Sequence, residues 1–144
     1  MAPLIVQIAT TLVARWFVPW KDAVRIGMTG MFVFTGASHF SSLRHDLAAM
    51  IPPPLTGSLP LVYLTGVLEI VGALGLLTRW RGQAAIFLVV LLLALFPANV
   101  YAAVQGLTLG GAPATALWLR TPLQLFWMAT LWWSTVGRPT PITS

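Results

Sequence analysis

The chain of 144 residues is 58% hydrophobic and only 8% charged, with a mean hydropathy of +0.85. Soluble domains carry about 25% charged residues, so the composition argues against a water-soluble globule and predicts an integral membrane protein. Eight Lys and Arg residues against three Asp and Glu give a net charge of +5. We interpret these cations as helix-end anchors that face membrane lipids, and we expect no nucleic-acid partner.

The sequence contains no cysteine. This excludes disulfides, thiol redox chemistry and thiolate metal sites, so we expect no covalent or thiol-ligated cofactor. A redox role would need a borrowed carrier, for which a quinone is the candidate. No basic segment precedes the first apolar stretch, and we predict no removable signal peptide.

The predicted fold is all-α, a polytopic transmembrane helix bundle that forms a single domain over residues 1–144. A crossing needs roughly 20 residues, so four or five helices would use nearly the whole chain. Charged and helix-breaking residues separate the predicted helices. Their ranges are 3–19, 23–40, 59–78, 83–104 and 120–137. The last four form the core; the first, which contains Gln7 and Arg15, either spans the bilayer or lies at its interface.

Two segments between these helices are predicted to be surface loops. Residues 41–58 include Pro52-Pro53-Pro54, which cannot continue a helix, and residues 106–113 include Gly110-Gly111. Because the helices alternate in direction, both loops should lie on one side. Five cations lie on the other side, which predicts a cytoplasmic C-terminus by the positive-inside rule. They are Lys21, Arg25, Arg79, Arg81 and Arg138.

Glu69 lies about ten residues into its apolar helix. A carboxylate near the middle of a bilayer costs about 2.5 kcal/mol or more, so it must be paired, neutral or hydrated. Its helical neighbours Thr65, Gly66, Gly72 and Ala73 are small and permit another helix to approach closely. We therefore expect Glu69 to face protein, and it is the best candidate for a proton-handling or catalytic group.

Further polar residues lie at related depths in the neighbouring helices. They are His39, Tyr63, Asn99 and Gln124, with Arg120 at the rim. Together with Glu69 they predict a cavity that binds a small amphiphile, for which a quinone offers carbonyl acceptors. The alternative is that these side chains only hydrogen-bond one another and fix helix register. Pro97 predicts a kink in its helix, and the Asn99 side chain could hydrogen-bond the backbone group that this kink exposes.

His39 and His45 raise the question of a metal site. Their separation of six residues places them about 240° apart on a helix, and only Asp46 and Glu69 could add carboxylate ligands. We therefore expect no metal.

Five segments form a linked set of motifs: residues 36–40 (GASHF), 46–53 (DLAAMIPP), 64–73 (LTGVLEIVGA), 96–100 (FPANV) and 119–124 (LRTPLQ). Together they resemble the DoxX-like family of small bacterial integral membrane proteins. The resemblance covers about residues 23–137 and implies four core helices, a multi-pass location in the bacterial cytoplasmic membrane, and links to redox systems. It marks His39, Glu69 and Asn99 as characteristic polar positions.

Three hypotheses about function follow. In the first, the chain is an accessory subunit of a membrane redox system that binds a quinone or another small amphiphile, without being an autonomous enzyme. In the second, it is a non-catalytic scaffold or assembly protein. In the third, it is a small carrier with an intramembrane acid. The expected partners are membrane lipids, a redox enzyme subunit or further copies of the chain.

Overall fold

The computed structural model describes residues 1–136. In this part of the chain the fold consists of six helices and one two-stranded hairpin. The helices are α1 (Ala2–Arg15), α2 (Trp20–Ser38), α3 (Arg44–Ala49), α4 (Leu59–Gly75), α5 (Arg81–Val104) and α6 (Leu117–Thr135). The hairpin pairs β1 (Thr108–Leu109) with β2 (Ala112–Pro113).

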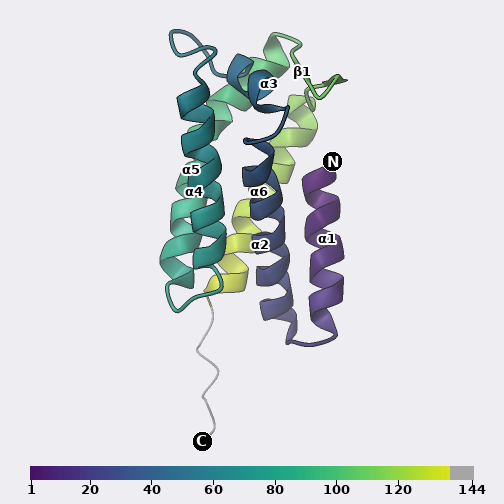
Figure 1. The fold of residues 1–144 in the computed structure, drawn as a ribbon. Coiled ribbons are helices and arrows are strands. Elements are labelled where there is room, and N and C mark those ends of the chain that lie inside the picture. Colours follow the sequence, from purple (N-terminus) through teal and green to yellow (C-terminus); the bar gives the residue numbers. More distant parts are fainter. Residues whose placement is uncertain (137–144) are drawn as a thin grey trace, which may run out of the picture.

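The long helices run side by side, and α1 packs along α2 at the edge of the bundle (Figure 1). The short connections at residues 16–19 and 76–80 lie at one end. The N-terminus, α3 and the hairpin lie at the other end (Figure 1). The prediction that both long connections lie on one side is therefore confirmed. Arg138, which the orientation argument also used, lies outside the described residues.

Small residues set the closest helix contacts. A Cβ added at Gly66 of α4 would lie 2.6 Å from the His39 Cβ and 3.0 Å from the Gly36 carbonyl oxygen of α2. Gly72, six residues farther along α4 and so on a different side of this helix, is packed against Leu88 of α5. The predicted small-residue stripe therefore does permit close approach, and it brings α2 and α5 against α4.

The apolar core fills the half of the bundle near the short connections. Met28 and Phe32 of α2 pack there with residues of α4, α5 and α6. The fully buried side chains of this core are Met28, Ala73, Leu76, Leu88 and Leu131. Burial of these side chains is the main favourable contribution to folding.

The connection at residues 39–58 is not wholly a loop, because it contains the six-residue helix α3. The connection after α5 contains the β hairpin, whose turn residues Gly110 and Gly111 have φ of +60° and +79°. A two-residue turn with positive φ at both positions favours glycine. The Gly110 N–H donates to Asp46 Oδ2 at 2.8 Å and so attaches the hairpin to α3.

The expectation of a polytopic bundle with four or five membrane spans is wrong. Among residues 1–136, α5 is the one helix both long and apolar enough to cross a membrane. Helices α1 and α4 have 14 and 17 residues, shorter than the roughly 20 residues of a typical crossing. Helices α2 and α6 have 19 residues each but include charged and amide side chains. Overall composition misled the prediction because it does not report how apolar residues divide among helices.

Many large apolar side chains nevertheless remain on the surface. Trp16 is 87% exposed, Trp118 78% and Val104 69%. Exposed apolar area of this extent predicts contact with lipid or with another protein.

Candidate functional site

A cavity of about 610 Å³ lies in the half of the bundle near α3 and the hairpin. Its volume falls within the range of about 300–1,000 Å³ that is usual for small-molecule sites. Its walls come from α1, α2, α4, α5 and α6, and α3 with residues 50–55 contributes at the same end. Apolar side chains make up most of the lining. The polar residues in it are Thr35, His39, Thr65, Glu69, Asn99, Thr115, Arg120 and Gln124.

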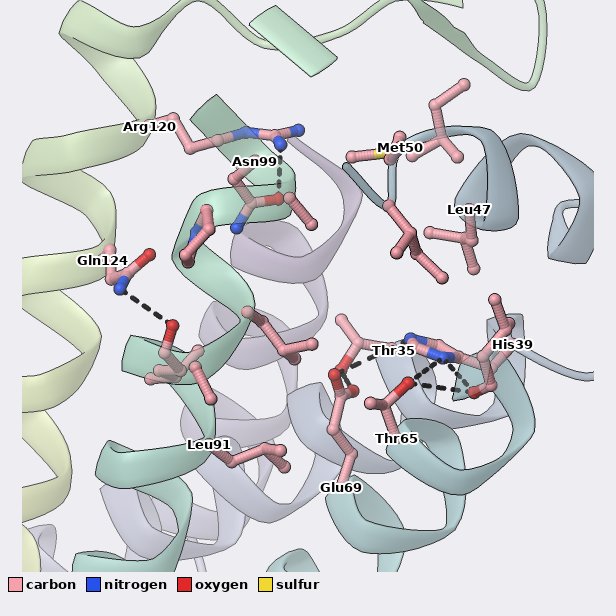
Figure 2. A pocket seen from close by; sticks show the side chains of 18 of the residues that line it. Thr35, His39, Leu47, Met50, Thr65, Glu69, Leu91, Asn99, Arg120 and Gln124 are labelled. Atoms are coloured by element: carbon pink, nitrogen blue, oxygen red, sulfur yellow. Dashed lines mark hydrogen bonds and ion pairs between the residues drawn. The ribbon is translucent and has the colours of Figure 1, made fainter. Parts of the chain in front are cut away.

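Glu69 projects from α4 into this cavity and is only 6% exposed. Its Oε2 accepts a hydrogen bond from Thr35 Oγ1 of α2 at 2.6 Å. Its Oε1 lies 3.7 Å from Nε2 of His39, the residue at the C-cap of α2 (Figure 2). The prediction that Glu69 faces protein is confirmed, and one turn of α2 supplies both of its polar neighbours.

The contacts of His39 fix which of its ring nitrogens carries a proton. Nδ1 lies 2.8 Å from the Val62 carbonyl oxygen, which can only accept, so Nδ1 is the donor. The Thr65 hydroxyl lies 3.1 Å from the same nitrogen and donates to main-chain carbonyls of its own helix. Nε2 therefore faces Glu69 either with a free lone pair or, in the imidazolium, with a second proton.

Burial raises the pKa of the Glu69 carboxyl above its ordinary value, because the charged form loses its hydration. The hydrogen bond from Thr35 and the nearby His39 oppose this shift. When His39 Nε2 carries a lone pair, Glu69 and His39 together can hold one proton on either the carboxyl or the imidazole. This arrangement can donate a hydrogen bond to a ligand or exchange a proton with it.

Arg120 of α6 and Asn99 of α5 form a second polar group on the cavity wall. Arg120 Nη1 donates to Asn99 Oδ1 at 2.6 Å. Figure 2 shows this pair toward the α3 end, away from Glu69 and His39. Partial burial lowers the pKa of Arg120, yet a guanidinium keeps its charge at neutral pH. The cavity thus has the Arg120 guanidinium toward its α3 end and the Glu69–His39 pair away from that end.

Gln124 of α6 donates from Nε2 to the Leu92 carbonyl oxygen of α5 at 3.1 Å. Helix α5 continues past Pro97, and the Asn99 side-chain oxygen accepts from Arg120. Gln124 of α6 therefore bonds the α5 main chain in the turn before Pro97, whereas Asn99, which was expected to bond this backbone, accepts from Arg120. Trp127 of α6 also lines the cavity. Its Nε1–H donates to Gln7 Oε1 of α1 at 2.9 Å and so links α6 to α1.

The structure brings five of the six predicted site residues to one cavity. They are His39, Glu69, Asn99, Arg120 and Gln124. Tyr63 does not line it: this residue is 36% exposed, and its ring stacks on Phe40 at 5.6 Å. Sequence reasoning gave no site role to Thr35 and Thr65. The signal was present, since Thr35 lies four residues before His39, and Thr65 four before Glu69.

Within residues 1–136, no three His, Asp or Glu side chains are placed to hold a metal ion. The Asp46 carboxylate accepts from the hairpin instead.

The family whose sequence model matches this chain is a domain of unknown function (DUF8561), and the match covers residues 28–135. The matched region includes every predicted site residue. No curated protein and no solved structure matches the chain significantly. The resemblance to the DoxX-like family therefore stays a prediction.

Proposed function

We propose that this chain, which belongs to the DUF8561 family of unknown function, binds a small amphiphile in the cavity between its helices. The observation that carries the proposal is the combination of a roughly 610 Å³, mostly apolar cavity with a buried Glu69–His39 pair on its wall. Ligand sites in proteins share this character: apolar walls and a few placed polar groups.

A structural role alone accounts poorly for the Glu69–His39 pair. Burying a carboxyl is costly unless it is neutral or well paired. Thr35 bonds one oxygen of Glu69, but the 3.7 Å separation of the other oxygen from His39 Nε2 is longer than a hydrogen bond. A ligand oxygen at the cavity surface could accept from the protonated carboxyl. A quinone carbonyl meets this need, which supports the narrower proposal of an accessory subunit in a membrane redox system.

The exposed apolar side chains support a location at a membrane. Residues such as Trp16, Trp118 and Val104 would otherwise face water. A membrane would also supply an amphiphile at high local concentration. We propose this location for the protein without assigning the number of crossings.

The test is organic extraction of the protein, purified in a non-ionic detergent, followed by mass spectrometry of all extracted lipid-soluble molecules. The wild type should carry one amphiphile in near-stoichiometric amount. Ala98→Trp, which fills the cavity from its α5 wall, should lose it. Val104→Trp adds the same side chain at an exposed position of α5 and should retain it.

The same extraction tests the quinone directly. If the ligand is a quinone, Glu69→Gln should lower its content, because the amide has no acidic proton to share with His39. Asp22→Asn is the matched control, since Asp22 pairs with Arg25 at the opposite end of the bundle. Equal amounts of every amphiphile in the wild type and in Ala98→Trp would refute the binding function and favour a scaffold.

A further inference from the structure

We propose that the amphiphile carries one anionic head group, a carboxylate, and that Arg120 is the residue that binds it. This inference rests on the proposed function, because it requires that the cavity binds an amphiphile. It assigns the small amphiphile to the single-chain carboxylates, in place of the neutral quinone considered above.

Arg120 has no acidic partner in the described residues. The ion pairs within 4 Å in residues 1–136 join Arg25 to Asp22 and His39 to Glu69. Arg120 donates to the neutral Asn99 amide, through one of its five N–H groups. A half-buried guanidinium on a mostly apolar wall is poorly hydrated, and its free N–H groups match the two oxygens of a carboxylate.

Arg120 also lies in the first turn of its helix, as the fourth residue of α6 (Leu117–Thr135). The positive end of the helix dipole disfavours a cation in the first turn. An anion bound there would be stabilised by both the guanidinium and the dipole, so the placement favours a ligand over a purely structural role.

The other residues of the lining indicate which end of the ligand lies at Arg120 and which lies toward Glu69. A ligand carboxylate beside Glu69 would place two acidic groups together in a part of the lining that has no Arg or Lys, which is unfavourable. Apolar residues Leu91, Leu92 and Leu95 of α5 line the cavity wall and can contact an alkyl chain. We therefore place the carboxylate at Arg120 and the alkyl chain along α5 toward Glu69; Figure 2 shows the positions of Arg120, Leu91 and Glu69. Arg120 is the one Arg or Lys side chain in the lining among the described residues, and a single guanidinium matches one carboxylate.

The experiment titrates the detergent-purified protein with three probes of equal chain length: dodecanoate, dodecyl phosphate and dodecanol. Trp127 lines the cavity, so intrinsic tryptophan fluorescence reports binding, with native mass spectrometry as a second readout. The variants are Arg120→Gln and, as a control, Arg44→Gln, which removes the same charge at the same end of the bundle but outside the cavity lining.

We expect dodecanoate to bind most tightly, and Arg120→Gln to weaken it by roughly tenfold or more, the usual effect of losing a charged hydrogen bond. Dodecanol should bind both proteins within about twofold of each other, which also shows that the variant folds. Arg44→Gln should bind all three probes like the wild type.

Two outcomes would overturn the inference while leaving the proposed function intact. One is equal binding of dodecanol and dodecanoate with no effect of Arg120→Gln. The other is a tighter, Arg120-dependent affinity for dodecyl phosphate. If no probe binds and the extraction yields no amphiphile, the proposed function fails together with the inference.

Discussion

Replacing Gly66 by alanine tests the contact that forms the candidate site. Gly66 lies on α4 where this helix meets α2, one turn from Glu69. An added Cβ would lie 2.6 Å from the His39 Cβ, 3.0 Å from the Gly36 carbonyl oxygen and 3.1 Å from the His39 Cγ. These separations are well below the 3.5–4.0 Å at which non-bonded carbon atoms attract best. The substitution therefore pushes against the α2 backbone and the His39 ring together.

Two opposing terms set the size of the effect. Alanine in place of glycine favours a helix by about 1 kcal/mol. Overpacking typically costs about 1–3 kcal/mol, and the upper part of this range applies because one neighbour is a backbone oxygen. We expect a net destabilisation of about 1–2 kcal/mol. The displacement of His39 should also weaken its 2.8 Å hydrogen bond to the Val62 carbonyl.

Thermal unfolding followed by circular dichroism, in the same detergent for all proteins, measures this change. Gly82→Ala is the matched control, because a Cβ at Gly82 of α5 meets nothing within 4 Å. The control should unfold at or slightly above the wild-type temperature, and Gly66→Ala several degrees below it. A Gly66→Ala protein as stable as the Gly82→Ala protein would refute the α2–α4 packing.

Three further predictions concern the groups around the cavity. Because the pKa of Glu69 is raised in the folded state, its contribution to stability is full below its ordinary pKa of about 4.5 and is lost as pH rises through the folded-state pKa. Denaturant titrations from pH 4 to 9 should therefore show that the wild type loses stability relative to Glu69→Gln as pH rises. His39, the titratable neighbour, is present in both proteins and so does not account for the difference. Parallel plots of unfolding free energy against pH for the two proteins would contradict this prediction. Thr35→Val removes the hydrogen bond to Glu69 Oε2 and should raise the carboxyl pKa further, measured by infrared absorption of the protonated carboxyl; an unchanged pKa would exclude the bond. Gln7→Leu leaves the Trp127 N–H without its partner and should cost about 1–3 kcal/mol in chemical unfolding, whereas a cost near zero would mean that α1 does not depend on this link.

The long helices were predictable because their apolar stretches are long and bounded by clear signals. The predicted ranges 23–40, 59–78 and 83–104 overlap α2, α4 and α5 closely. The segment 120–137 matches α6 apart from its ends, and residue 137 lies outside the described residues. α3 was missed because six residues are too few to show helical periodicity. The hairpin was missed because its strands have two residues each.

The number of membrane spans was predicted wrongly, for a physical reason. The average hydropathy of the chain does not distinguish one long apolar helix from several helices that are short or interrupted by polar residues. Only α5 meets both requirements among the described residues. Charged residues such as Lys21 and Arg120 lie inside helices α2 and α6, not only at boundaries between spans.

The candidate site was partly predictable. Glu69 and His39 were identified because ionisable residues are rare in so apolar a chain. Tyr63 was grouped with them by depth alone, yet its direction on α4 places it beside Phe40 and outside the cavity lining. Thr35 and Thr65 entered no predicted site because threonine often bonds its own helix backbone, and only the packing of α2 on α4 brings them to His39 and Glu69.

Photocrosslinking tests most directly whether an amphiphile occupies the cavity. A diazirine placed on the alkyl chain of a dodecyl probe reacts with the residues that the chain contacts, and mass spectrometry of the digested protein identifies them. We predict labels on cavity-lining residues of α5 and α6, such as Leu91, Leu95 and Leu123, and their loss in Ala98→Trp. Labels confined to exposed residues such as Val104 and Trp118, unchanged in Ala98→Trp, would contradict the account.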